Sequence, residues 1–350
     1  MNKFQKYPST IQYSGVVKQV LDHCSYNNLP IPTLTFSGST KIHGTNSGIG
    51  YNTAGEVWFQ SRERVLEIDK DNAGFCLWGE HNKDKWKLFF KQMSNTYCLL
   101  FDNIYIFGEF FGPGIHKGVA VNQIQEKKFG IFRMVFVKYD TVDAEKFIEF
   151  DVDPVEWNDT LNDLFDNVFV VDAVVPPIEL TIDFNKPHLV QNTLLELTLQ
   201  VEKECPVGKY FGVVDGCTIG EGLVWSTADV DWLPRFKTKG LLHSSSKVVT
   251  LRELTEAEIS SKANSAEFVE YSCTKNRLEQ GIDKLGEMGL PVDIKSMGTF
   301  LKFISTDILR ECRDVLVASN INLKDVMPDI NRKSKEWFMV YLNSEIVLAA

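Results

Sequence analysis

The sequence predicts an α+β fold in which antiparallel sheets with flanking helices come first and a small all-α region follows. Two patterns lead to this prediction. In the first two-thirds of the chain, short stretches rich in aromatic and β-branched residues are separated by Gly, Asn and Asp. After about residue 245, apolar residues instead recur every three or four positions, which is the period of an α-helix.

The elements expected in the first part are short. We predict strands over Thr33–Ser37, Val57–Gln60, Tyr105–Phe111, Phe129–Val137 and Gly222–Ser226. Helical patterns lie between them, over Ser14–Cys24 and Asp84–Met93. Because strands and helices do not alternate regularly, antiparallel sheets are favoured over a parallel one.

The second part begins after a polar, serine-rich stretch, Leu242–Lys247. We predict a first domain over 1–243, a linker over 244–249 and a helical domain over 250–350. One helix face is expected to carry Phe268, Tyr271, Lys275, Leu278, Ile282 and Leu285, and the pattern repeats in Met297, Leu301, Ile304 and Ile308. The acidic residues of Glu253–Glu258 suit the start of an earlier helix.

Composition excludes several classes of protein. With 350 residues, 44% hydrophobic and 24% charged, the chain has the make-up of a globular protein. Its seven cysteines are scattered and never form Cys-x-x-Cys, which argues against a disulfide framework and a structural zinc site. No signal peptide is readable at the N-terminus, and no apolar run is long enough to span a membrane. We therefore expect a cytoplasmic protein.

Charge is distributed unevenly along the chain. The net charge is −10, yet residues 140–204 hold 16 acidic and 3 basic residues. Between Trp232 and Arg252 there is no acidic residue, while Arg235, Lys237, Lys239, Lys247 and Arg252 are all present. Such a basic strip suits contact with nucleic acid phosphates, although a solvated surface can show the same pattern.

The most informative stretch is Ser39–Asn46, which contains Lys41-Ile-His-Gly44. It is not a P-loop, because the lysine is not preceded by glycine. It matches Lys-x-x-Gly, the nucleophile motif of covalent nucleotidyltransferases. The motif alone is weak, but further stretches resemble the successive motifs of this superfamily in the expected order: Ser61-Arg62, Phe107–Gly114, Lys128–Phe132, Glu221–Trp225 and Arg235–Lys239.

Lys41–Asn46 and Phe107–Ile115 resemble most closely the bacteriophage RNA ligase 2 family, which includes the kinetoplastid RNA-editing ligases. The resemblance covers nearly the whole chain, is weakest over 140–200, and continues into Asn276–Gly286. It implies a nucleotidyltransferase (ATP-grasp-like ligase) domain and an ATP-dependent RNA ligase for RNA repair. Such an enzyme joins a 3′-hydroxyl to a 5′-phosphate at nicks in duplex RNA. ATP, Mg²⁺ or Mn²⁺, an RNA partner, a monomeric state and, for a virus, the host cytoplasm are implied as well.

Lys41 is the nucleophile that this resemblance implies. A lysine amine has a reference pKa of about 10.4, so it must lose a proton before it can attack a phosphate. Lys237, Lys239 and a bound metal would supply the positive field that favours this loss and would neutralise the triphosphate. Without the other motifs, a solvated turn lysine would be the better interpretation.

The resemblance assigns the nucleotide contacts to several further residues. Glu109 would bind the ribose and Glu221 the metal, although either could be a carboxylate that protects a strand edge. Phe132 would stack on the adenine, with Phe129 as the alternative, and either could be a core residue. Ile42 and Asn46 would also contact the nucleotide.

Phosphate and RNA contacts complete the predicted site. His43 and Asn46 would act around the RNA 5′-phosphate and the adenylate. Arg62 suits a phosphate contact because its planar fork matches phosphate geometry, and Arg64 is its competitor. Arg235 and Lys247 are further candidates for RNA binding.

Two positions depart from the family pattern. Ser226 stands where a lysine is usual, and Arg133 where an aspartate is common. Neither is the nucleophile, the metal glutamate or the final lysine pair, so we expect an active enzyme. Three other functions stay open: a DNA ligase, a capping-type guanylyltransferase, and a non-catalytic RNA-binding repair protein.

Overall fold

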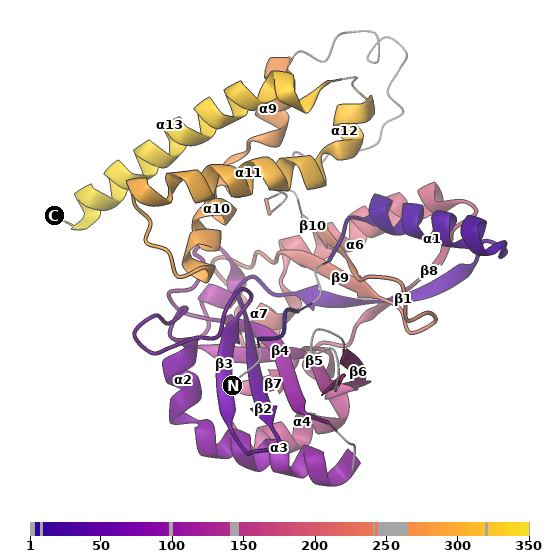
Figure 1. Ribbon diagram of the computed structural model, residues 1–350, viewed down its shortest axis with the longest axis vertical. Helices are drawn as coiled ribbons and strands as arrows, with labels where there is room; N and C mark the ends of the chain where they lie inside the picture. The colour runs from indigo at the N-terminus through magenta and orange to yellow at the C-terminus, as the bar shows by residue number, and fades with distance from the viewer. Residues whose placement is uncertain are drawn as a thin grey trace. The chain divides into compact units, whose positions relative to one another are not determined.

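The computed structural model describes residues 4–7, 10–97, 101–140, 147–240, 242–243, 265–318 and 321–349. The chain divides into two compact units, Met1–Gly240 and Leu241–Ala350. The first contains two sheets flanked by helices, and the described part of the second is helical (Figure 1). The predicted α+β class with a helical C-terminal region is confirmed. The expected linker 244–249 and the acidic stretch 253–258 lie outside the described residues.

One sheet of the first unit has four antiparallel strands in the order β10-β9-β1-β8. They span Phe236–Lys239 (β10), Gly222–Ser226 (β9), Thr33–Lys41 (β1) and Ile178–Asp183 (β8). Apolar side chains of this sheet, such as Phe36 and Trp225, pack against the helices α1 (Tyr13–Asn27) and α6 (Gln191–Lys203). Successive residues of a strand point to opposite faces, so the other face carries every second residue of β1 and ends at Lys41.

The other sheet has six strands, five of them in the order β3-β2-β4-β5-β6, with β7 parallel to β5. They span Val57–Ser61 (β3), Thr45–Asn52 (β2), Asn103–Phe111 (β4), Lys128–Tyr139 (β5), Phe147–Val152 (β6) and Val168–Val170 (β7). A large aromatic core that includes Phe75, Trp86 and Phe129 lies on the face covered by the helices α2 (Phe75–His81), α3 (Lys83–Tyr97) and α4 (Asn158–Leu164). A smaller cluster with Trp58, Tyr105 and Phe107 lies on the opposite face.

Short segments connect the two sheets. The helix α5 (Val171–Val174) leads from β7 of the six-stranded sheet to β8 of the four-stranded sheet. The remaining short helices are α7 (Pro206–Tyr210), η1 (Ala120–Asn122), η2 (Pro154–Trp157) and η3 (Pro187–Val190). The turn between β1 and β2, residues 42–44, is a second crossing between the sheets.

The second unit packs its helices around Phe300, Ile304 and Phe338. The helices are α9 (Ser265–Ser272), α10 (Lys275–Glu287), η4 (Ile294–Ser296), α11 (Met297–Glu311), α12 (Arg313–Ala318) and α13 (Leu323–Ala349). None of the helices in the described residues combines the length and apolar character needed to cross a lipid bilayer. The six cysteines in that part of the chain form no disulfide with one another.

The helix face predicted from Phe268 to Leu285 is divided between two helices. Phe268 and Tyr271 belong to α9, whereas Lys275, Leu278, Ile282 and Leu285 belong to α10. Thr274 begins the second helix because its hydroxyl accepts a hydrogen bond from the backbone N–H of Arg277. The apolar spacing continues across this cap, so the spacing alone could not reveal the break.

Candidate active site

Strand register places the predicted lysines in rows on the polar face of the four-stranded sheet. Lys41 of β1 and Lys239 of β10 both lie opposite Gly222 of β9. The next row contains Ser39, Val224 and Lys237. Ser226 pairs with Ser37 in a third row, and Arg235 immediately precedes β10. Lysines therefore lie in the first and second rows of this face, and serine hydroxyls lie in the second and third.

Three basic side chains converge on the carboxylate of Glu221. Lys41 Nζ lies 2.6 Å from Glu221 Oε2, and His43 Nδ1 lies 3.2 Å from the same oxygen. Lys239 Nζ lies 3.0 Å from Oε1. The Glu221 side chain is only 2% exposed, so these neighbours take the place of water.

The cations also determine the protonation of Glu221. Burial by itself raises the pKa of this carboxyl, but Lys41, Lys239 and His43 together hold the pKa well below its usual range. The pKa of His43 is lowered because burial disfavours its charged form, and Glu221 only partly opposes this effect. The carboxylate is therefore ionised at neutral pH, while the imidazole favours its neutral form.

Gly44, the glycine of the Lys-x-x-Gly motif, allows the β1–β2 turn to lie against β4. A Cβ atom at this position would come within 2.5 Å of the carbonyl oxygen of Phe110, so no larger residue fits. The backbone N–H of Gly44 donates a hydrogen bond to Glu109 Oε1 at 3.1 Å. Asn46 is opposite Glu109 in the β2–β4 pair, so both side chains lie on the same face of the sheet.

Phe132 lies at an irregularity in the β4–β5 pairing. Phe107 pairs with Arg133 and the next residue, Gly108, pairs with Ile131, which leaves Phe132 as an extra residue in a β-bulge. Its half-buried ring contacts the ring of Tyr7, with the centroids 5.0 Å apart. Phe129, the competing candidate, is fully buried in the aromatic core and cannot stack on a ligand.

Ile42, Arg62 and Arg64 were also predicted as possible ligand contacts, and each has a different environment. The side chain of Ile42 is buried in a cluster with Phe111 and Phe169, which leaves only its backbone for a ligand. Arg62 follows β3, and its Nε lies 4.0 Å from Glu63 Oε1, whereas the Arg64 side chain donates to the carbonyl of Lys70 at 2.6 Å. Arg64 is thus already engaged in its own loop.

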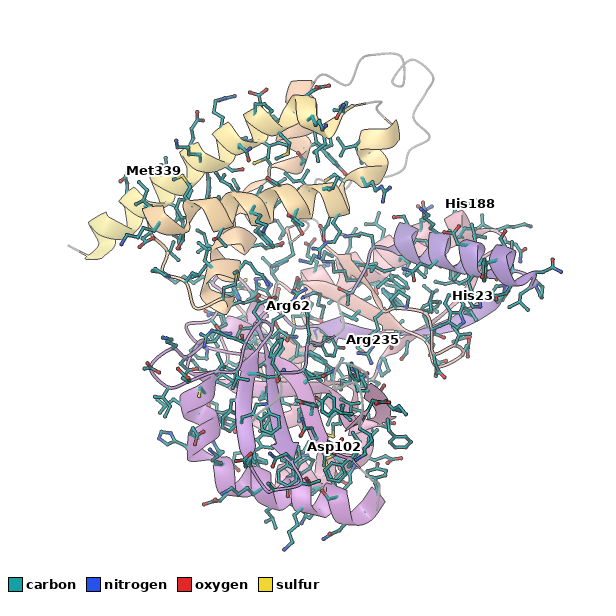
Figure 2. The ribbon with its side chains drawn as sticks, viewed as in Figure 1. His23, Arg62, Asp102, His188, Arg235 and Met339 are labelled. Atoms are coloured by element: carbon teal, nitrogen blue, oxygen red, sulfur yellow. The ribbon has the colours of Figure 1, made fainter. Side chains whose placement is uncertain are left out.

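Arg235 interacts with the N-terminal segment. Its guanidinium donates to the hydroxyl of Tyr7 and lies 5.6 Å from the centre of the Tyr7 ring. Figure 2 labels Arg62, which follows β3 of the six-stranded sheet, and Arg235, which precedes β10 of the four-stranded sheet. Lys247, the last residue predicted to bind RNA, lies outside the described residues.

The two departures from the family pattern have separate settings. Arg133 is buried and joins β5 to β6 through Asp151 at 2.6 Å and Glu149 at 2.6 Å. The guanidinium of Arg133 is therefore engaged in ion pairs that hold two strands together. Ser226 lies in the third row, two rows away from Lys41, where it pairs with Ser37.

Two residues that sequence analysis did not identify also lie at this site. Tyr7 contacts Phe132, as described above, and Asp172 of α5 accepts a hydrogen bond from Ser39 Oγ at 2.8 Å. Asp172 is one of many acidic residues between 140 and 204, and the chain gives no local signal that distinguishes it.

The described residues contain no group of three or more His, Cys, Asp or Glu side chains that could hold a metal ion. Glu221 is the carboxylate beside Lys41, and its other close neighbours are basic. A metal that binds here would need most of its ligands from water or from a bound phosphate group.

Comparison with known proteins identifies the family. No curated protein matches the chain in sequence. An RNA ligase from Naegleria gruberi, solved with AMP and Mn, is 15% identical with a TM-score of 0.42; the match covers 68% of this chain but only 56% of that one. An archaeal ATP-dependent RNA ligase is 12% identical with a TM-score of 0.40, over 98% and 74% of the two chains. The RNA ligase family model matches residues 35–240, and the chain therefore belongs to the RNA ligase family.

Proposed function

We propose that this protein is an ATP-dependent RNA ligase that forms a covalent lysine–AMP intermediate on Lys41. The supporting observation is the contact between Lys41 Nζ and the buried carboxylate of Glu221, with Lys239 on the other carboxylate oxygen. A turn lysine without a catalytic role would be expected in solvent. The family match and the ATP- and AMP-bound Naegleria ligases agree with this proposal.

The reaction would consist of three displacements at phosphorus. Lys41 loses a proton, and its nitrogen then bonds to the α-phosphorus of ATP as the bond to pyrophosphate breaks. AMP next passes to the 5′-phosphate of an RNA strand. The 3′-hydroxyl of the neighbouring strand then displaces AMP and closes the backbone. The first row of the sheet would neutralise the phosphates, and the site would act mainly by positioning and charge.

A divalent ion fits this site only as a companion of the nucleotide. Mg²⁺ usually keeps several waters and binds one or two carboxylates together with substrate phosphates. Glu221 is ionised and buried, so it could supply one such carboxylate once a triphosphate draws the lysines away. When bound, Mg²⁺ or Mn²⁺ would neutralise phosphate charge.

The substrate is proposed to be a nick in duplex RNA. A-form RNA would be recognised by its shape and 2′-hydroxyls rather than by its sequence. Arg62 and Arg235 are the described candidates for backbone contacts, and the helical unit is proposed to add further contacts. We propose that the protein acts as a monomer in the cytoplasm.

Covalent labelling tests the central step. The full chain is incubated with Mg²⁺ and ATP labelled at the α-phosphate, and the protein-bound label is measured. We expect the wild type to be labelled and Lys41→Ala to remain unlabelled. Lys87→Ala is the matched control, because Lys87 is an exposed lysine of α3 that pairs with Asp84 on the same helix. Equal labelling of the Lys41 variant, or an unlabelled wild type, would contradict the proposal.

Three further assays separate the remaining possibilities. An RNA ligase seals a nick in duplex RNA faster than the same nick in all-DNA duplex, whereas a DNA ligase does the reverse. Labelling by GTP in preference to ATP would indicate a guanylyltransferase. Tight RNA binding by a wild type that neither nucleotide labels would indicate a non-catalytic repair protein.

A further inference from the structure

Asp172 lies where the two sheets of the first unit are joined. It belongs to α5, which links β7 of one sheet to β8 of the other. Its Oδ2 accepts the hydrogen bond from Ser39 Oγ. Ser39 is two residues before Lys41 on the same face of β1, so the carboxyl lies one row away from the proposed nucleophile.

The second oxygen of this carboxyl is unusual. Asp172 Oδ1 is buried and has no hydrogen-bond partner among the described residues. A buried polar atom without a partner is destabilising, so a ligand that supplies a donor to it would gain binding free energy. The pKa of Asp172 is raised overall, chiefly because burial disfavours the charged form. Asp153 adds to this increase, whereas the Ser39 hydrogen bond and Arg235 oppose it.

The surroundings of Asp172 suit a nucleobase better than a phosphate. Lys239 lies in the first row with Lys41, and Lys237 lies in the second row with Ser39 and Val224. An ionised carboxylate beside this row repels a phosphate, whereas it can accept a hydrogen bond from a base. One row corresponds to two residues along a strand, or roughly 7 Å. A nucleotide whose α-phosphate lies at Lys41 would reach the second row with its base. The half-buried Phe132 provides an aromatic ring from the other sheet.

We propose that Asp172 selects adenine by accepting a hydrogen bond from its 6-amino group, with Ser39 holding the carboxyl in position. This inference rests on the proposed function, because it assumes that the nucleotide is attached through Lys41. The 6-amino group of adenine is a donor, whereas guanine has an acceptor oxygen at the same place. An ionised carboxylate can only accept, so guanine would leave two acceptors facing each other.

The test compares two nucleotides that differ only in this amino group. Self-labelling kinetics are measured with ATP and with purine riboside triphosphate, which has no 6-substituent. For the wild type we expect the second-order rate constant of labelling to favour ATP by about tenfold to hundredfold, the range typical of a hydrogen bond to a charged group. Asp172→Ala should reduce this preference to near unity by raising the ATP concentration that gives half-maximal labelling rate. Asp163→Ala, which removes an exposed acidic residue of α4, should keep it.

A second variant protects the test against misfolding. Asp172→Asn keeps the shape of the side chain but adds a donor, so it should improve labelling by GTP relative to ATP. The inference is wrong if Asp172→Ala lowers labelling by ATP and by purine riboside triphosphate equally and Asp172→Asn leaves the ratio of the GTP and ATP labelling rates unchanged. Asp172 would then only stabilise the contact between α5 and β1.

A binding measurement separates this inference from the proposed function. Calorimetry measures the Kd of both nucleotides for Lys41→Ala and for the double variant Lys41→Ala/Asp172→Ala, in which no transfer can occur. We expect the first protein to prefer ATP and the second to show no preference. If the wild type is never labelled but this difference is found, the catalytic proposal fails while base selection by Asp172 stands. Equal binding of both nucleotides by Lys41→Ala would overturn the inference.

Discussion

A single buried carboxylate links the basic residues of the site. Glu221 contacts Lys41, His43 and Lys239, which come from two strands and the turn between sheets. A buried ion pair contributes little by itself, because desolvation offsets the attraction between the charges. Removal of one partner is nevertheless costly, since the other charges stay behind without compensation.

We therefore expect Glu221→Gln to lower the free energy of unfolding by about 3 kcal/mol. Urea denaturation of the full chain measures this change. Glu204→Gln is the control, because Glu204 pairs with Lys209 at 2.7 Å while both side chains are about half exposed, and such surface pairs contribute about 1 kcal/mol or less. Equal losses in the two variants would show that the lysines do not depend on Glu221.

Asp172 gives a prediction about pH. Because burial raises its pKa in the folded protein, folding favours the protonated form. Stability from this group is full below the unfolded-state pKa of about 3.9 and is lost as the pH rises through the higher folded-state value. Asp172→Asn cannot ionise, so its unfolding free energy relative to wild type should rise over this pH range and then level off. Urea denaturation at a series of pH values measures the difference, and a difference that is constant with pH would contradict the prediction.

At the residue scale, the sequence points to candidate site residues where the motif is local. The Lys-x-x-Gly motif and the later Glu-Gly and Lys-x-Lys stretches could be recognised because each is short and they follow one another in order. The structure brings Lys41, Glu221 and Lys239 together, although their chemical roles stay predictions. The contact between Ser39 and Asp172 joins residues 133 positions apart. No local pattern indicates which of many acidic residues makes it.

At the scale of elements, strands were predictable because their alternation is local. Gly222–Ser226 was predicted with the bounds that β9 has, and β1 was placed correctly but extends further, to Lys41. The β-bulge at Phe132 could not be predicted, because it depends on how β5 pairs with β4. For the same reason the sequence left Phe129 and Phe132 as alternatives.

The start of α2 supports the turn that follows β1. Asp71 accepts hydrogen bonds from the backbone N–H groups of Cys76 and Leu77, near the beginning of this helix. The neighbouring Asn72 donates to Thr45 Oγ1 at 2.6 Å, which connects the same loop to the first residue of β2. Asp71 therefore caps the first turn of α2, and the neighbouring Asn72 links this cap to the strand that follows the Lys-x-x-Gly turn.

Replacement of this cap should destabilise the protein measurably. We expect Asp71→Ala to lower the free energy of unfolding by about 1–2 kcal/mol, because the backbone N–H groups of Asn72, Cys76 and Leu77 lose their acceptor. Thermal or urea unfolding followed by circular dichroism measures the loss. Asp69→Ala, in the same loop and exposed, should change stability by about 0.5 kcal/mol or less. A similar effect of both variants would mean that the cap contributes nothing.

At the scale of the whole molecule, the family match and the first compact unit end at the same residue. The match covers 35–240 and the unit ends at Gly240. The second unit has an interior of its own, in which Arg277 is fully buried and donates to Asp307 at 2.8 Å. Glu311 lies 3.5 Å from the same guanidinium.

This buried group tests whether the two units are independent. Arg277→Ala removes the buried cation between Asp307 and Glu311 and leaves them with the half-exposed Arg310, so it should destabilise the second unit by about 3 kcal/mol. Labelling of Lys41 by ATP should be unchanged, because the residues proposed for that step lie in the first unit. Scanning calorimetry together with the labelling assay measures both effects. Arg332→Ala, which removes an exposed arginine of α13 paired with Asp329 and Glu336, should leave both unchanged. Loss of labelling in Arg277→Ala would show that the units depend on each other.

The strand order of the four-stranded sheet has a consequence for protein synthesis. β1, which carries Lys41, is the first strand of the unit to leave the ribosome, while β9 and β10, which flank it on one side, are the last. A nascent or prematurely terminated chain thus contains Lys41 long before Glu221 and Lys239 have been translated. Fragments that stop before Glu221 are therefore expected to remain unlabelled by ATP, because the proposed nucleophile lacks both partners.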